Sequence, residues 1–359
     1  MEANDSASDS INANTSNSAH LLVIRLSAMG DVAMTVPVLS SLLQRYPNLR
    51  ITLLTRKFFE PMFSSMPQIT VFEADVTGKH KGLIGLWRLY KALKKEQPAA
   101  IADLHNVLRS KILMLFFSFS SIPIRQIDKG RKEKKALTAI KNKVFRPLKT
   151  THERYADVFR GLGYPIELNT STFQHKRQLN HKILEVAGDR NTSWVGIAPF
   201  AAYEAKMYPL NLMEKVVEEL NRKNSYKIFL FGGGTEEMKL LKAMEVKYNN
   251  VIAIPDKLKF EEELNLISHL DLMLSMDSGN GHLAAIFGIP TITLWGVTHP
   301  HAGFYPFGQA PENALLADRK DFPAIPTSVY GNKFPQGYEK AMAGIPPDTI
   351  VRRIAELTR

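Results

Sequence analysis

Short apolar runs alternate with amphipathic stretches along most of this chain of 359 residues. Apolar runs bounded by turn residues are typical of buried parallel strands, and the stretches between them repeat apolar positions at helical spacing. In the first half, strand-like runs occupy 21–26, 51–55, 71–73 and 99–103, and helical patterns end near Tyr46 and cover 83–97. The alternation predicts βαβ units around a parallel sheet over residues 20–125.

The same alternation begins again after a polar stretch at 174–192. Strand-like runs lie at 194–198, 227–231, 251–254, 272–275 and 291–295, with helical patterns at 210–221, 234–248 and 261–269. We therefore expect an α/β protein with one unit at 20–180 and a second at 181–345. Residues 346–359 predict a terminal helix that starts with proline and could pack back on the first unit.

Neither end of the chain nor its longest apolar run predicts a membrane segment. Residues 1–19 are rich in Ser, Asn, Asp and Ala, which indicates a disordered tail and not a signal peptide. The run Ile112–Ile124 is interrupted by serines and is too short to span a bilayer. We expect a protein of the cytosol.

The amino-acid composition limits the kinds of functional site that the chain can form. The chain has no cysteine, which excludes disulfides, thiolate metal sites and a cysteine nucleophile. Residues 1–180 hold 27 basic and 14 acidic side chains, against 19 and 21 in residues 181–359. The segment 125–149 alone holds ten basic and two acidic side chains. Such an excess favours an anionic partner, namely phosphate, nucleic acid or an anionic membrane surface, over a solvated basic helix.

The first candidate motif, Arg25 to Asp31, ends the first strand, where open parallel sheets bind ligands. Gly30 allows close backbone approach. Asp31 is either a helix N-cap or a positioned carboxylate, and its position alone favours the cap. The motif lacks the G-x-G-x-x-G pattern of dinucleotide-binding dehydrogenases.

Two more motifs follow strands of the second half. Lys206 precedes a helix start, where a lysine is well placed to meet a phosphate, although a solvated loop lysine is the commoner case. Gly232, Gly233 and Gly234 let backbone amides approach a ligand. No Gly-Lys-Ser/Thr follows them, so they do not form a P-loop.

The fourth motif spans Ser275 to Ala285 and opens a helix directly after a buried strand. The amides at such a helix start favour an anion. Asp277 can accept hydrogen bonds from sugar hydroxyls or orient the loop, and His282 faces either a ligand or the core.

Other catalytic signatures are missing from the sequence. His299 and His301 flank a proline without a third ligand candidate, so no metal site is expected. The chain has no G-x-S-x-G elbow and no RNA-binding aromatic signature beside its basic segment.

Three motifs in this order resemble the heptosyltransferases of glycosyltransferase family 9, which assemble the lipopolysaccharide core. The family opening pattern is matched by Arg25, Ser27, Gly30, Asp31, Thr35 and Pro37. The G-I-x-P…K-x-(W/Y)-P pattern is matched by Gly196, Ile197, Pro199, Lys206, Tyr208 and Pro209. The D-(S/T)-G-x-x-H-L-A-A pattern is matched by Asp277, Ser278, Gly279 and His282–Ala285, and the resemblance runs from about residue 20 to 355.

The resemblance implies a GT-B fold, with two Rossmann-like domains whose parallel sheets face each other across a cleft. It also implies inverting, metal-independent transfer of heptose from a nucleotide-heptose, typically ADP-heptose, to an anionic inner-core glycolipid. The donor is a substrate, so no cofactor is expected, and neither is nucleic acid. The acceptor lies at the cytoplasmic membrane, so we expect a peripheral association with its inner face.

The resemblance also assigns residues to roles. Asp31 matches the proposed general base, and Lys206 matches the lysine that faces the diphosphate. The expected donor-binding residues are Asp277, Ser278, Gly279, Asn280, His282, Gly233 and Glu236, with Glu237 as an alternative to Glu236. The expected acceptor-binding residues are Arg25, Ser27, Gly30, Arg131 and Lys132, because the segment 125–149 is interpreted as facing the acceptor or the membrane.

The chain departs from the family at several positions. Met34 stands where many members carry His, Phe200 to Ala202 replace a more polar turn, and Ala341-Met342 occupies a stretch that often contains Cys. Two alternatives therefore stay open. One is the same fold acting on another nucleotide-sugar or acceptor, and the other is a non-catalytic binder of anionic lipid or nucleic acid.

Overall fold

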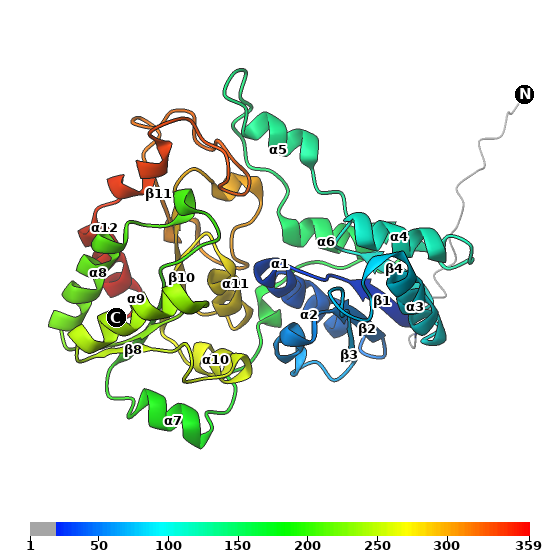
Figure 1. Cartoon of the computed structure of the whole chain (residues 1–359), viewed down its shortest axis with the longest axis horizontal. Coiled ribbons are helices and arrows are strands. Elements are labelled where there is room, and N and C mark those ends of the chain that lie inside the picture. Colours follow the sequence, from blue (N-terminus) through cyan, green and yellow to red (C-terminus); the bar gives the residue numbers. More distant parts are fainter. Residues whose placement is uncertain (1–18) are drawn as a thin grey trace, which may run out of the picture.

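Two parallel sheets, each covered by helices on both faces, form the two lobes of the molecule (Figure 1). This computed structural model describes residues 19–359, so the tail expected at 1–19 lies outside the described residues, apart from Ala19. The α/β prediction with two parallel sheets is confirmed.

The first lobe contains a five-stranded sheet of order β3-β2-β1-β4-β5. Its strands are β1 (His20–Ile24), β2 (Arg50–Thr55), β3 (Ile69–Glu73), β4 (Ala100–Asp103) and β5 (Ile124–Gln126). Its helices are α1 (Met29–Ala33), α2 (Thr35–Arg45), α3 (Gly82–Lys95), α4 (Leu108–Phe117), α5 (Arg131–Leu137) and α6 (Thr151–Arg160). Alternate residues of β1 face opposite ways: Leu21 packs in the cluster with α2 and α6, and Leu22 in that with α3 and α4.

The second lobe contains a six-stranded sheet of order β11-β10-β9-β6-β7-β8. Its strands are β6 (Ser193–Ala198), β7 (Tyr226–Leu230), β8 (Val251–Ala253), β9 (Leu272–Met276), β10 (Thr291–Trp295) and β11 (Ala314–Leu316). Its helices are α7 (His181–Ala187), α8 (Leu210–Arg222), α9 (Thr235–Lys247), α10 (Phe260–Ile267), α11 (Gly279–Ile286) and α12 (Pro347–Leu357). The two sheets lie on either side of the segment 175–192, where the sequence predicts the boundary between the units.

The terminal helix corrects one expectation. Helix α12 packs against α8 of the second lobe, through a buried face of Ile350, Val351 and Ile354. It does not return to the first lobe, because its apolar stripe completes the cluster that covers one face of the second sheet.

The two lobes touch through helices that begin at the ends of strands. Helix α1 follows β1, helix α11 follows β9, and the two lie side by side in the centre of the molecule (Figure 1). One apolar cluster continues across this contact and includes Val32 of α1 and Leu283 of α11. The loops on which the sequence motifs lie are therefore brought together between the lobes.

Candidate active site

Three of the sequence motifs follow β1, β6 and β9, which lie where the strand order of each sheet reverses. In the first sheet β1 pairs with both β2 and β4, and in the second sheet β6 pairs with both β7 and β9. Chain connections leave such neighbouring strands in opposite directions, which opens a crevice beyond their carboxyl ends. The loops after β1, β4, β6 and β9 all reach this crevice.

Asp31 is held by an ion pair and does not cap its helix. Its Oδ2 lies 2.6 Å from a guanidinium nitrogen of Arg25, whose side chain is buried. Arg25 also donates to the backbone oxygen of Leu104, so β1 and the loop after β4 jointly position the pair. Ala28 occupies the N-cap of α1 without a side-chain hydrogen bond. The cap interpretation of Asp31 is therefore wrong, because its carboxylate faces Arg25.

A cavity of about 220 Å³ extends from Asp31 into the first lobe. Arg25, Ser27 and His105 line it, together with Tyr330 from the second lobe. Burial and the nearby Arg25 lower the pKa of His105 to about 3, so this imidazole is neutral. Three further cations line the cavity, namely Lys129, Lys134 and Arg154. The cationic side chains suit an anionic ligand, and the carboxylate of Asp31 lies at one end of the cavity.

The basic segment supplies different residues from those predicted. Arg131 and Lys132 line a separate hollow, and the cavity at Asp31 receives Lys129 and Lys134 from the same segment. Burial, together with the charge of Arg154, lowers the pKa of Lys134 to about 8. Sequence identifies the basic segment but not which of its side chains turn inward.

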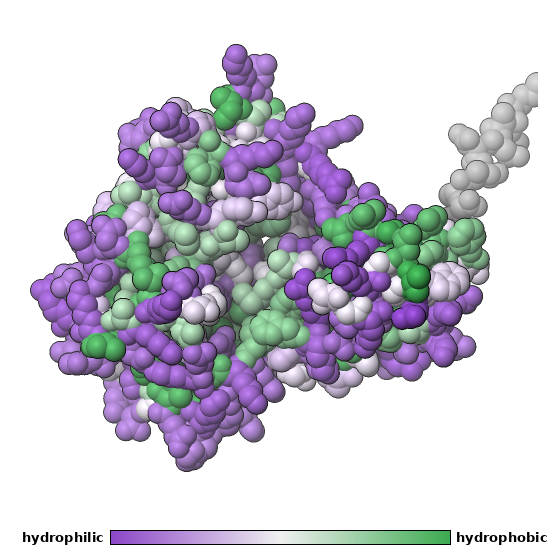
Figure 2. Space-filling view, viewed as in Figure 1, coloured by the Kyte–Doolittle hydropathy of each residue, from purple (hydrophilic) through white to green (hydrophobic). Residues whose placement is uncertain are grey.

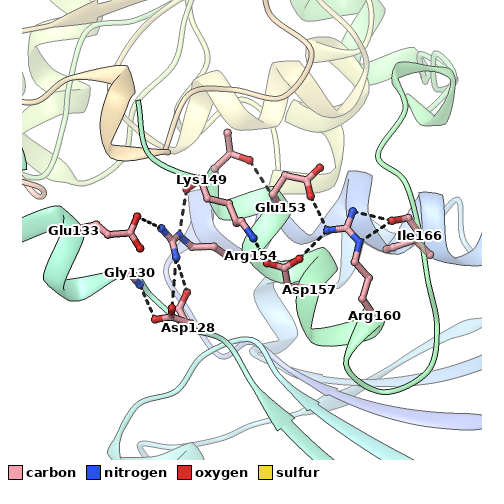
Figure 3. Close-up of polar contacts among 10 residues, drawn as sticks. Asp128, Gly130, Glu133, Lys149, Glu153, Arg154, Asp157, Arg160 and Ile166 are labelled. Atoms are coloured by element: carbon pink, nitrogen blue, oxygen red, sulfur yellow. Dashed lines mark hydrogen bonds and ion pairs between the residues drawn. The ribbon is translucent and has the colours of Figure 1, made fainter. Parts of the chain in front are cut away.

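Arg154 anchors this segment to α6 (Figure 3). Its buried guanidinium donates to the backbone oxygens of Asp128 and Lys149 and to the carboxylate of Glu133. A buried arginine keeps one geometry when each of its three nitrogens donates to an acceptor, as here. Arg154 therefore fixes the segment that carries Lys129 and Lys134 over the cavity.

The end of the basic segment packs on the second lobe. The ammonium of Lys143 donates a hydrogen bond to the backbone oxygen of Pro326, with 2.6 Å between the nitrogen and the oxygen. The backbone nitrogen of Leu148 donates to the oxygen of His301, and that of Thr151 to the oxygen of Gly303. The interpretation of all of 125–149 as facing acceptor or membrane is thus corrected, since this part joins the lobes.

Lys206 and Asp277 form the counterpart of the Arg25–Asp31 pair in the second lobe. Lys206 follows β6 and Asp277 follows β9, and Nζ lies 2.9 Å from Oδ2 with both side chains largely buried. Asp31, Lys206, Asp277, Ser278 and other residues line one cavity between the lobes, of about 270 Å³. The structure thus brings together the two residues to which the resemblance assigns catalysis.

The first residues of α11 face this crevice, and they lie very close to α1. Ser278 is the N-cap and makes no side-chain capping bond. A Cβ atom on Gly30 would lie 3.1 Å from Cδ2 of His282 and 3.2 Å from Cα of Gly279. The lack of a side chain at Gly30 is what allows Asp31 to approach the amides of α11.

His282 completes this contact as a neutral group. Burial lowers the pKa of its imidazole to about 4. Its Nδ1 is buried and has no hydrogen-bond partner among the described residues.

A larger cavity of about 670 Å³ lies beside α11 on the second lobe. Gly233, Gly279 and Asn280, three of the residues predicted to bind the donor, line it. Glu236 does not, because it is exposed and paired with Lys239. The next residue, Glu237, turns into the cavity and accepts a hydrogen bond from the nitrogen of Gly233. The assignment of Glu236 is corrected to Glu237, since successive helical residues point about 100° apart.

Glu263 also lines this cavity, and no sequence signal pointed to it. Burial raises the pKa of its carboxyl group to about 7. Residues 261–263 are all glutamate, so the pattern does not indicate which of the three faces inward. Arg154 and His105 were missed because they lie outside the motifs, and Lys134 because the basic segment does not indicate which of its side chains face inward.

The sequence and the fold both resemble those of known glycosyltransferases. The model of glycosyltransferase family 9 (heptosyltransferase) matches residues 86–322. The lipopolysaccharide core heptosyltransferase OpsX of Haemophilus influenzae is 26% identical over 286 residues, covering 78% of this chain and 80% of that protein. Lipopolysaccharide heptosyltransferase 3 of Escherichia coli is 25% identical over 285 residues, covering 75% and 80%.

Solved structures share the two-lobed architecture. A glycosyl transferase family 9 protein of Veillonella parvula superposes with a TM-score of 0.73 at 16% identity, covering 95% of this chain and 97% of that one. The E. coli heptosyltransferase WaaC with ADP gives 0.67 at 18% identity, covering 94% and 99%. These likenesses establish the GT-B fold.

Proposed function

Because this chain belongs to glycosyltransferase family 9, we propose that it transfers a heptose from ADP-heptose to an anionic acceptor of the lipopolysaccharide core. The named relatives are lipopolysaccharide heptosyltransferases, and one related structure holds ADP. The observation that carries the proposal is the shared cavity of Asp31 and Lys206, which come from different lobes.

The cavity supports a direct displacement. The acceptor hydroxyl oxygen attacks the anomeric carbon of the heptose, and the bond from that carbon to the diphosphate oxygen breaks. The hydroxyl proton passes to the carboxylate of Asp31, which Arg25 holds in place. The electron pair of the broken bond leaves with ADP. Attack from the side of the first lobe, opposite to the leaving group, inverts the anomeric centre.

The second lobe stabilises the departing diphosphate. Lys206 supplies a positive charge at the crevice, and the amides at the start of α11 face the same space. Groups of this kind can neutralise developing negative charge without a divalent cation. We therefore propose metal-independent transfer and expect turnover to persist in a chelator.

The cavity in the first lobe supports an anionic acceptor. Arg25, Lys129, Lys134 and Arg154 line it and match a ligand that carries several negative groups. A lipid-linked acceptor places the enzyme at the inner surface of the cytoplasmic membrane. We propose that this acceptor holds the enzyme there as a peripheral protein. Within residues 19–359 no helix is long and apolar enough to cross a bilayer.

The first test is acceptor-dependent release of ADP from ADP-heptose. We expect Asp31→Asn to lower kcat by about 100-fold or more, because the amide cannot take the hydroxyl proton. Asp321→Asn is the matched control, since Asp321 is an exposed aspartate outside these cavities. Thermal unfolding of both variants checks that the fold is kept.

Two outcomes would contradict the proposal. ADP release by Asp31→Asn at the wild-type rate would remove the base from the mechanism. Absence of release from ADP-heptose, combined with thermal stabilisation by a different nucleotide, would assign another donor to the same site.

A further inference from the structure

Helices α3 and α4 expose a continuous apolar surface on the first lobe. We call it the α3–α4 face and define it by Leu83, Ile84, Trp87, Leu108, Leu115 and Phe119. Phe119 is 85% exposed, and Leu108 is 75% exposed. Figure 2 shows hydrophobic side chains gathered over these two helices. Single exposed apolar side chains are ordinary, but a gathered group of this size calls for a partner.

The spacing of these residues places them on the outer side of each helix. Leu83, Ile84 and Trp87 lie within one turn of α3, while the inward side of the same helix carries the buried Leu86 and Leu89. Along α4 and just beyond it, Leu108, Leu115 and Phe119 recur at helical intervals. The edge of Trp87 meets the ring of Phe116 at 5.1 Å between centroids, so the two stripes form one surface.

Helices α3 and α4 carry charges of one sign only. Residues 76–95 and 104–127 contain nine Lys or Arg and no Asp or Glu. Arg88 and Lys91 of α3 and Arg109 and Lys111 of α4 are exposed beside the apolar side chains. Apolar and aromatic side chains ringed by cations are the composition that binds the interface of an anionic bilayer.

The same charge disfavours a second copy of the chain as the partner. A two-fold interface would bring the same face of both molecules together, and therefore cation against cation. We propose that the α3–α4 face docks on an anionic phospholipid bilayer and inserts its apolar side chains at the level of the head groups.

The position of the face suits a lipid-linked acceptor. After β4 the chain carries His105 into the cavity at Asp31, and α4 begins only three residues later at Leu108. A lipid held in the bilayer under α4 can thus present its head group to the cavity. This link to catalysis rests on the proposed function, whereas the bilayer binding itself does not.

Vesicle flotation tests the proposal without donor or acceptor. The intact protein should float with phosphatidylcholine vesicles that contain about 30 mol% phosphatidylglycerol, bind pure phosphatidylcholine more weakly, and dissociate as salt is raised. The variant Leu83→Gln/Ile84→Gln/Phe119→Ser should bind anionic vesicles at least about tenfold more weakly. The control Leu184→Gln/Val246→Gln changes exposed apolar residues elsewhere and should bind as the wild type does.

Tryptophan emission gives a second measurement. Trp194 and Trp295 are buried, and Trp87 is the third tryptophan and is 45% exposed. Anionic vesicles should shift the emission to the blue, and Trp87→Phe should abolish the shift. The opposite result, a shift that survives in Trp87→Phe, would place the bound surface elsewhere.

Three further results would overturn the proposal. One is equal vesicle binding by the triple variant and the wild type, and a second is equal weakening by the control. The third is a wild-type dimer that the triple variant converts to a monomer without change in vesicle binding, which would assign the face to a second copy. Transfer to a delipidated, soluble acceptor should be unchanged in the triple variant. If the wild type does not transfer heptose to this acceptor, the proposed function is contradicted, but the proposed binding to the bilayer is not.

Discussion

At the scale of single residues, ionised Glu263 destabilises the folded protein, which the sequence around it does not indicate. Its carboxyl group is half-buried in the cavity of the second lobe, and burial raises its pKa from 4.5 to about 7. The folded protein therefore holds this proton more tightly than the unfolded chain does. Between these two values, stability falls as pH rises, because the unfolded chain loses this proton and folding then has to take it up again.

Glu263→Gln should remove this pH dependence. At about pH 8 the variant is expected to be more stable than the wild type by about 1–2 kcal/mol, and at about pH 4 the two should be equal. Urea unfolding at both pH values measures the difference. Glu261→Gln, an exposed neighbour on α10, is the control. A gain for Glu263→Gln that is the same at both pH values would refute the electrostatic origin.

At the scale of elements, the contact between α1 and α11 sets the distance between the two halves of the candidate site. Gly30 lies against Gly279 and His282, so the backbone of one helix touches the other. Asp31 is the next residue of α1, and the amides that face the crevice begin α11. Any displacement of one helix from the other therefore moves the proposed base away from the proposed donor site.

Gly30→Ala should separate these helices by a few tenths of an ångström and lower kcat by about tenfold, because catalysis requires close alignment of the reacting atoms. The matched control is Gly281→Ala, whose Cβ would meet Ser275 at an ordinary 3.4 Å. ADP release measures kcat, and thermal unfolding checks stability. Equal rates for Gly30→Ala and the control would show that the contact does not govern alignment.

At the scale of the whole molecule, the segment after α5 forms a second contact between the lobes, in addition to that of α1 with α11. Lys143 bonds to Pro326, and the ring of Phe145 lies under the guanidinium of Arg319 at 3.6 Å. Phe145 also contacts the rings of His299 and His301. This contact connects the segment that carries Lys129 and Lys134 directly to the second lobe.

Lys143→Ala should loosen this junction by about 1–3 kcal/mol, because two carbonyl oxygens lose a charged donor. Hydrogen exchange should then become faster at Leu148 and Thr151, whose amides bond to the second lobe. Lys141→Ala is the control, since Lys141 is exposed in the same segment. Unchanged exchange at both amides in Lys143→Ala would show that the junction does not depend on this lysine.

Much of the architecture follows from local patterns in the sequence. Strands such as β1 and β6 are continuous apolar runs because both faces of a parallel sheet are covered. The motifs directly after β1, β6 and β9 could be assigned to one edge of each sheet, since parallel strands share the direction of their carboxyl ends. This position made Asp31, Lys206 and Asp277 candidates, whereas the resemblance to the family supplied their roles.

Contacts between distant segments were decided only by tertiary structure. Whether Glu236 or Glu237 faces the cavity depends on the rotation of α9, and whether Lys129 or Arg131 reaches Asp31 depends on the anchoring of Arg154. The apolar stripe of α12 predicts a helix but does not specify α8 as its partner. Sequence periodicity determines which side of an element is apolar, whereas the neighbour that covers it is chosen by the packing of the whole chain.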